Sequence, residues 1–394
     1  MSTATETATL ASNILTHDNS VVPIQTRSER PTSFEPTDFA NPTGHEVNFK
    51  HSPVNRLQPL LNVDAVASDA VSHTVTPATF AVASAGHDAA VRGEFFRPED
   101  RMSALAWRNS ADAVHVRIPA NEEVAEPITI AIDGSGIADA AFAHIVIEAM
   151  PNARATVILD HKGAATYAQN VEIIARDGSD LRVISVQRWS EDTVHAAAHQ
   201  ARVDKDATLT HLVASLSGGV VRVNPSVQLD GAGSEGKLYG VSFADPGEHL
   251  ESQVYMFHKG AHTTGDVLYK SALQGDTART VWIGDVLIGA DAVGTDSYEA
   301  NRNLVLTTGA RADSIPNLEI QTGDIQGAGH ASATGRFDDE QLFYLQARGI
   351  SEEEARRLVV VGFLGEIVQK IGVPALEEEL FDAIQVELSD GVSA

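Results

Sequence analysis

The side chains that could do chemistry here are histidines and carboxylates, because the 394-residue sequence contains no cysteine. Without thiolates the chain alone cannot form a disulfide, a thiolate zinc site or a thiolate-held iron–sulfur cluster. It also lacks a nucleophile elbow, a P-loop, a G-x-G-x-x-G loop and an H-E-x-x-H motif. The case for an enzyme therefore rests on a few histidines and acidic residues.

One histidine pair has the spacing of a helical zinc site. His258 and His262 would lie on one face of a helix. However, Gly260 interrupts the segment and its neighbours have β-type composition. Because four residues of strand span about 13 Å, too far for one metal ion, we expect no metal site there.

Acidic residues could supply general acid–base chemistry. Asp177, Asp180, Asp204 and Asp206 could form carboxylate pairs in a groove, as a polysaccharide-processing enzyme would need. Such an enzyme usually also needs a basic residue or a bound calcium ion nearby. Capping of exposed turns explains these aspartates more simply.

His330 is the strongest candidate ligand. It follows Gln326-Gly-Ala-Gly329 and precedes Ala331-Ser-Ala-Thr-Gly335, so its ring has little to pack against. An exposed neutral imidazole is a good ligand for iron or zinc. The simpler alternative is a polar turn histidine.

Short β-type segments fill the chain from about Val114 to Ile320, most of them four to six residues long. Apolar and polar residues alternate in them, and small-residue corners such as Asp177-Gly-Ser179 and Gly309-Ala-Arg311 recur between them. This pattern favours a solenoid or β-helix, with a sandwich or barrel as the alternative. We predict four regions: a flexible arm (1–45), a mixed helical region (46–113), a β-helix core (114–335) and a C-terminal helical domain (336–394).

The last region carries clear helix signals. Ser351 followed by Glu354 forms a capping box, and Pro374 opens a second helix. An apolar stripe is expected along the first helix, through Ala355, Leu358, Val359, Gly362, Phe363, Ile367 and Ile371. So many apolar residues in a small helical unit also suit a partner.

The charge of the chain limits its partners. Its net charge is −26, with no basic cluster, which disfavours nucleic acid and anionic lipid. We see no secretory signal and no apolar stretch long enough for a membrane span. The sequence predicts a soluble, cytoplasmic protein.

A series of motifs resembles the SufB/SufD family, the scaffold subunits of the SUF iron–sulfur cluster assembly machinery. The likeness covers most of residues 45–390 and is strongest over residues 300–365. The motifs are Asn301-Arg-Asn-Leu304, Gly309-Ala-Arg-Ala312, Ile315-Pro-Asn-Leu-Glu-Ile320, Asp324, His330, Gly335, Asp338, Leu342-Phe-Tyr-Leu345, Arg348-Gly-Ile350, Glu354-Ala355 and Gly362-Phe363.

Within this family the chain looks like the SufD type. SufB types carry a cysteine on the C-terminal part of the β-helix, whereas this chain has none. Many SufD proteins have Cys-Ser-His where this sequence reads Ala328-Gly-His330, so no thiol role carries over to this loop. The resemblance leaves His330 as the matched ligand candidate.

The resemblance implies a right-handed parallel β-helix and a non-catalytic scaffold in an ATPase-driven complex. A SufB-type subunit would pair along the β-helix, and a SufC-type ATPase would bind the C-terminal helices. His330 and a SufB cysteine would hold a transient iron–sulfur cluster. Reduced flavin could also bind the complex, and the isolated chain could form a homodimer. The candidate interface or switch residues are Arg336, Asp338, Phe343, Tyr344, Arg348, Glu354 and Phe363.

Two other functions stay open at this stage. One is a stand-alone β-helix enzyme acting on carbohydrate, which the helical tail disfavours. The other is a SufB-like subunit working as a homodimer, which the missing cysteine disfavours.

Overall fold

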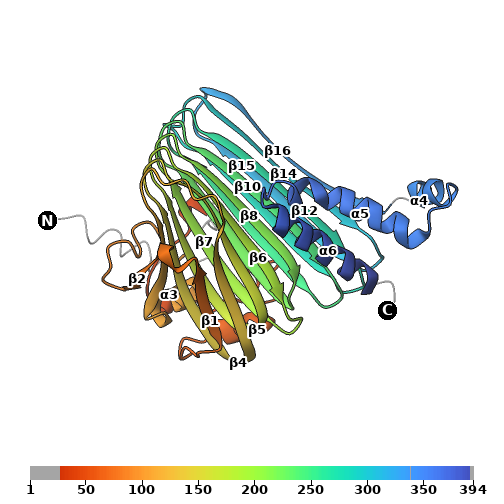
Figure 1. The fold of residues 1–394 in the computed structure, drawn as a ribbon, viewed down its shortest axis with the longest axis horizontal. Helices are drawn as coiled ribbons and strands as arrows, with labels where there is room; N and C mark the ends of the chain where they lie inside the picture. The colour runs from red at the N-terminus through yellow and green to blue at the C-terminus, as the bar shows by residue number, and fades with distance from the viewer. Residues whose placement is uncertain (1–26, 338, 391–394) are drawn as a thin grey trace, which may run out of the picture.

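A computed structural model describes residues 27–337 and 339–390 of the chain. In this part of the chain sixteen strands join in one sheet and wind into a parallel β-helix (Figure 1). The strands are β1 (Val71–Thr76), β2 (Ala81–Gly86), β3 (Asp112–Ile118), β4 (Ile128–Ala149), β5 (Arg154–Ala175), β6 (Asp180–Trp189), β7 (Val194–Val203), β8 (Thr208–Ser217), β9 (Val220–Leu229), β10 (Glu235–Ala244), β11 (His249–His258), β12 (Thr264–Leu273), β13 (Arg279–Ile288), β14 (Thr295–Val305), β15 (Arg311–Ile320) and β16 (Ile325–Arg336). The predicted β-helix core is therefore confirmed.

The strands stack in two alternating series. The first half of β5 pairs with β6 and its second half pairs with β7. From there the even strands continue in parallel to β16, and the odd strands continue in parallel to β15. Each coil thus contributes one strand to each face, and most of these strands are ten residues long.

The interior between the two faces is mainly apolar. The buried cluster runs from Val116 and Ile118 in β3 to Ile288 in β13 and Val305 in β14. Inward-facing Val, Ile and Leu side chains explain why alternating sequence forms these strands. The expected strand lengths of four to six residues were wrong, because inward-facing polar residues such as His199 and His211 are also buried.

The first coil is covered by further strands. β1 pairs with β4, and β2 pairs with β3, both antiparallel. These strands lie in the region 46–113, which we expected to be mixed and helical, together with the short α2 (Val54–Leu57) and α3 (Arg101–Asn109). Asp100 caps α3 by accepting a hydrogen bond of 2.8 Å from the Ser103 backbone N–H.

Most of the expected flexible arm, residues 1–26, lies outside the described residues. From Arg27 onwards the segment packs on the solenoid. The Arg27 guanidinium is buried, donates a 2.9 Å hydrogen bond to the Gln253 carbonyl and pairs with Glu99 at 3.2 Å. This part of the arm is therefore fixed in place.

Of the three C-terminal helices in the described part of the chain, the last two lie along the face formed by the even strands, whereas the first lies away from the sheet and contacts the second (Figure 1). In chain order they are α4 (Asp339–Gln346), α5 (Glu352–Val368) and α6 (Pro374–Asp390). The buried positions of α5 pass through Val360 and Leu364, whereas Leu358 of the expected stripe is 45% exposed. No helix among the described residues is long and apolar enough to cross a membrane.

Candidate functional site at the open end of the solenoid

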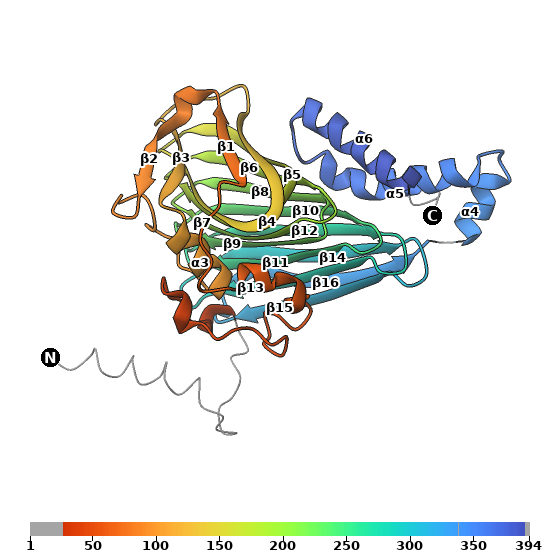
Figure 2. The same cartoon turned by 90° about the horizontal axis from the view of Figure 1, so that it is seen from below.

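The two ends of the solenoid differ. β1 pairs along β4 at the N-terminal end, whereas among the described strands β15 pairs only with β13 and β16 only with β14. The outer edges of β15 and β16 therefore have no strand beside them at the C-terminal end (Figure 2). Unpaired N–H and C=O groups along an edge are available to another chain.

His330 lies on this edge. It is directly opposite Glu299 in the β14–β16 register, and its Nδ1 is 3.8 Å from Glu299 Oε1. The His330 side chain is 45% exposed, and its neighbours Gly329 and Ala331 are small. The imidazole is thus accessible from outside while one of its nitrogens faces a carboxylate.

Glu299 lies inside the solenoid and is fully buried. Neither of its carboxylate oxygens has a partner at hydrogen-bond geometry among the described residues. Burial, with a smaller contribution from the charge of Asp285, raises the pKa of Glu299 to about 8, and the Asn317 backbone N–H, which approaches the carboxyl without reaching hydrogen-bond geometry, opposes this rise only in part. Gly284 on the opposite face makes room for the carboxylate, because a Cβ at this position would overlap Glu299 Oε2.

The inward-facing asparagines on the same strand already have hydrogen-bond partners. Asn301 Oδ1 accepts hydrogen bonds of 2.8 Å from Ser314 and from Asn303, and Asn303 donates to Thr334 Oγ1 at 3.1 Å. These bonds tie β14 to β15 and β16. Glu299 on the same strand differs from these asparagines, because its carboxylate oxygens have no such hydrogen bonds.

An imidazole and a carboxylate are suitable ligands for ferrous iron. Among the described residues no group of three or more His, Cys, Asp and Glu side chains could hold a metal ion. The Glu299–His330 pair could therefore supply only part of a coordination sphere. Further ligands would have to come from a second molecule.

The histidine pair of the sequence analysis is not brought together. His258 is buried, and its ring nitrogens lie 2.8 Å from Thr263 Oγ1 and 2.9 Å from Ser297 Oγ. His262 occupies a turn with a positive φ of 57° and is not buried with it. His258 thus has two hydroxyl partners of its own.

The acidic corner residues are partnered or lie at turns. Asp204 accepts a 2.8 Å hydrogen bond from Arg202, and Asp177 accepts one of 3.1 Å from the Lys205 backbone N–H. Asp206 sits in a turn with φ 54°. Asp177 thus caps a turn as expected, whereas Asp204 is held by an arginine side chain and Asp180 begins β6.

The expected interface residues are spread over β16, α4 and α5. Arg336 ends β16 and is exposed, while Asp338 lies outside the described residues. On α4, Phe343 is 72% and Tyr344 56% exposed, and the Arg348 guanidinium lies 4.4 Å from the Tyr344 ring centre. These residues leave an aromatic surface on α4.

Two residues of that set have partners within the chain. Glu354 pairs with Arg357 at 2.6 Å rather than reaching back to Ser351, although the Ser351 side chain does cap α5. Phe363 packs against the solenoid, with the Lys270 ammonium 4.7 Å from its ring centre. Phe363 therefore helps to hold α5 in place.

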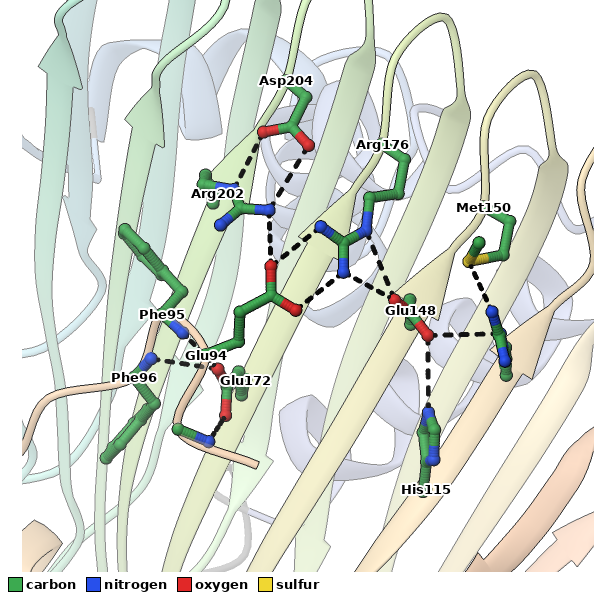
Figure 3. Close-up of polar contacts among 12 residues, drawn as sticks. Glu94, Phe95, Phe96, His115, Glu148, Met150, Glu172, Arg176, Arg202 and Asp204 are labelled. Atoms are coloured by element: carbon green, nitrogen blue, oxygen red, sulfur yellow. Dashed lines mark hydrogen bonds and ion pairs between the residues drawn. The ribbon is translucent and has the colours of Figure 1, made fainter. Parts of the chain in front are cut away.

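A second cluster of charged groups lies near the N-terminal end (Figure 3). Arg176 bridges Glu94 and Glu148, with nitrogen–oxygen distances of 2.7 Å to both. Glu172 accepts hydrogen bonds of 2.6 Å from the Phe95 backbone N–H and 3.0 Å from that of Phe96. This cluster fixes the segment before α3 against β4 and β5.

The carboxylates of this cluster have lowered pKa values. Hydrogen bonding to His115 and to Arg176, opposed by burial, brings the pKa of Glu148 to about 2. The hydrogen bond from Arg176 also lowers the pKa of Glu94. A general acid at neutral pH needs a raised pKa, so the cluster has the chemistry of a structural network.

Replacing Arg176 by glutamine is expected to lower the free energy of unfolding by about 1.5–3 kcal/mol, because it removes charge-assisted hydrogen bonds. Glu148 titrates at about pH 2 in the folded chain, against an ordinary 4.5. Its stabilising contribution is therefore present above pH 4.5 and lost as the pH falls towards 2. Urea unfolding over this pH range should show a weaker acid dependence in Arg176→Gln.

The control for this test is Arg117→Gln. Arg117 contacts the same carboxylate at 3.3 Å, but its side chain is 48% exposed. Exposed pairs contribute about 0–1 kcal/mol. Equal losses in the two variants would contradict the role assigned to Arg176.

Sequence reasoning missed Glu299. A local signal exists, because Ser297, Glu299, Asn301 and Asn303 alternate along β14 in an otherwise apolar interior. The pairing that places Glu299 beside His330 connects two separate strands, however. It is not visible in the local pattern of either strand.

Comparison with known proteins gives a consistent match. Residues 130–363 match a family model described as the SufBD core domain of SUF-system FeS cluster assembly. A Mycobacterium bovis protein named as an iron–sulfur cluster assembly SufBD family protein is 46% identical over 364 residues, covering 90% of this chain and 91% of its own length. A protein of the same description from Mycobacterium leprae is 45% identical, covering 91% and 93%. A second such Mycobacterium leprae protein is 29% identical over 228 residues, covering 58% of this chain and 26% of its own length.

Proposed function

The chain belongs to the SufBD family of iron–sulfur cluster assembly proteins, and from this premise we propose that it is a SufD-type scaffold subunit. In this role it pairs with a SufB-type subunit through the open end of its solenoid and binds a SufC-type ATPase through its C-terminal helices. It has no catalytic step of its own and works in the cytoplasm. The nascent cluster is the cargo of the complex.

The observation that carries the proposal is the position of His330. Its imidazole is exposed on the last strand of the solenoid, where a second β-helix could add its own edge strand. A cluster is held mainly by thiolates, and this chain has no cysteine. Thiolates must therefore come from the partner, and the open edge is where the partner would bring them.

The relatives offer a parallel for two subunit types. Mycobacterium leprae has two proteins named as SufBD family members, and this chain is 45% identical to one and 29% identical to the other. This difference supports two distinct kinds of chain. The difference in identity agrees with a complex of two different SufBD subunits, of which this chain is one.

The ATPase site is assigned to the exposed side of the helical region. Phe343 and Tyr344 of α4 and Leu358 of α5 are exposed large apolar residues. Exposed apolar surface on helices suits a partner protein. The opposite side of α5 is fixed to the solenoid through Lys270, which pairs with Glu366 at 2.6 Å, so that movement of the ATPase would be passed to the β-helix.

The test is co-expression of this chain with its cognate SufB-type and SufC-type proteins, for wild type and for His330→Ala. We expect both to give a complex of one SufB-type subunit, two ATPase subunits and one copy of this chain. Anaerobic cluster reconstitution should fall by at least about tenfold in the variant, since even the loss of an outer-shell partner costs about 10–100-fold at metal sites. Native mass spectrometry and visible absorption measure the two outcomes.

His45→Ala is the matched control, because His45 is also exposed but lies in the N-terminal segment. It should leave both the complex and the cluster yield unchanged. Full cluster assembly in His330→Ala would remove the ligand role, and the absence of any complex would overturn the scaffold proposal.

A further inference from the structure

We propose that Glu299 and His330 together form a two-ligand binding site for a ferrous ion, so that this chain supplies iron to the shared site with a carboxylate as well as an imidazole. This inference rests on the proposed function, because it adds a second ligand to the same site. It concerns a residue on β14 that lies behind the exposed histidine. It requires no oxidation or reduction, and the Glu299 carboxyl releases its proton to solvent when the ion binds.

The first observation is the state of the Glu299 carboxylate. The side chain is fully buried, yet neither oxygen has a partner at hydrogen-bond geometry among the described residues. A buried carboxylate without a partner is costly. The polar side chains beside it on β14 do not share this property, because Ser297 contacts His258 at 2.9 Å and Asn301 accepts from Ser314 at 2.8 Å.

The second observation is the distance between the two groups. His330 Nδ1 and Glu299 Oε1 are 3.8 Å apart, which is too long for a hydrogen bond. Two ligand atoms at about 2.1 Å from a tetrahedral metal ion would be about 3.4 Å apart. A shift of a few tenths of an ångström would therefore let one ion bridge the imidazole and the carboxylate.

The third observation is the space around the pair. Gly284 on β13 lacks the Cβ that would overlap Glu299 Oε2. On the other side, His330 is 45% exposed at the open edge. An ion between the two residues would thus contact the buried Glu299 carboxylate on its inner side. Its outer side would be open to ligands from a partner.

The chemistry of the pair fits ferrous iron before sulfur arrives. Carboxylate and imidazole are harder ligands than thiolate and bind a free divalent ion without sulfide. A chain with no cysteine could hold iron in this way, while thiolates of the partner complete the coordination.

The experiment titrates Fe²⁺ alone into the full chain under anaerobic conditions and follows the heat of binding. High ionic strength screens diffuse binding to the acidic surface, because the chain has a net charge of −26. We expect one site in the wild type, weakened at least about tenfold by Glu299→Gln and by His330→Ala. Glutamine keeps the shape of glutamate, so the fold should be retained.

Glu248→Gln is the matched control. Glu248 is also a buried carboxyl with a pKa raised by burial, to about 7, but its oxygens accept hydrogen bonds of 3.0 Å from the Gly218 and Asp245 backbone N–H groups. The Glu248→Gln variant should bind Fe²⁺ as tightly as the wild type does. Thermal unfolding of each variant verifies that the fold is intact.

The outcomes separate this inference from the proposed function. If His330→Ala weakens binding and Glu299→Gln does not, Glu299 is no ligand, while the scaffold function stands. If the wild type binds no Fe²⁺ above the level of His330→Ala, the two-ligand site is overturned. Formation of the co-expressed complex is measured independently and decides the scaffold function.

Discussion

Replacing Arg222 by methionine is expected to lower the free energy of unfolding by about 3–5 kcal/mol, because it leaves a buried carboxylate without its main cationic partner. Arg222 on β9 and Glu251 on β11 are direct neighbours in the sheet register. Their side chains are 2% and 0% exposed, and the Arg222 Nε donates to Glu251 Oε1 at 3.0 Å.

The pair also holds the N-terminal segment to the solenoid. Arg222 donates to the Asn48 carbonyl at 3.1 Å, and its guanidinium lies 4.8 Å from the Phe49 ring centre. Glu251 in turn accepts a 2.8 Å hydrogen bond from Ser52. Loss of the arginine should therefore loosen the segment around Phe49 as well as the sheet.

A double variant tests the cause. Arg222→Met with Glu251→Met removes both charges, so the part of the loss that comes from the unpaired buried carboxylate should return. Arg311→Met is the control, because Arg311 is 63% exposed in its pair with Asp313 and should cost at most about 1 kcal/mol. A double variant no more stable than Arg222→Met would contradict the buried-charge explanation.

Acid unfolding gives an independent measurement of the same pair. Burial raises the pKa of Glu251, but the His249 hydrogen bond and the Arg222 charge outweigh it and bring the pKa to about 2, against an ordinary 4.5. Its contribution is thus complete above pH 4.5 and disappears as the pH falls towards 2. The double variant should lack this part of the acid dependence.

The alternation in the strands and the repeated corners favoured a β-helix but left a sandwich or barrel open, and the family resemblance decided between them. The lengths of the strands could not be predicted, since the solenoid buries polar side chains within them. His199 and His211, for example, lie 2.9 Å apart inside the structure. A buried histidine interrupts the apolar pattern just as a solvent-facing residue would, so each strand looks shorter than it is.

The covering elements were harder to predict than the core. β1 has the alternating sequence Val-Ser-His-Thr-Val-Thr, but it pairs with β4, far along the chain. In α5 the consecutive apolar residues Val359, Val360 and Val361 allow more than one buried face. Packing against the solenoid selects the face, and that choice is not encoded in the helix alone.

The two residues of the candidate site also differ in how far the sequence alone could predict them. His330 could be proposed from its sequence neighbourhood and from the family resemblance, because small residues around a histidine are a local feature. Glu299 could not be proposed in this way, because only the strand register places it opposite His330. Residues that act through cross-strand contact become visible only when the coils are stacked.

Replacing Gly163 by alanine is expected to lower the free energy of unfolding by about 2–5 kcal/mol, the sum of a backbone cost and a packing cost. Gly163 lies at the corner where β5 changes its partner from β6 to β7. Its φ is +82°, a conformation that costs an L-residue about 1–2 kcal/mol. A Cβ there would also overlap the carbonyl oxygen of Gly134 in the preceding coil, adding about 1–3 kcal/mol of overpacking.

Two other glycines separate these causes. Gly247 has a similar φ of +86° but open space where a side-chain carbon would lie, so Gly247→Ala should cost only about 1–2 kcal/mol. Gly136, with neither a positive φ nor a close neighbour, should change stability by less than about 1 kcal/mol. Denaturant unfolding followed by tryptophan fluorescence ranks the three variants. If Gly163→Ala costs no more than Gly247→Ala, the stacked corner tolerates a side chain, and close contact between successive coils is not what requires glycine there.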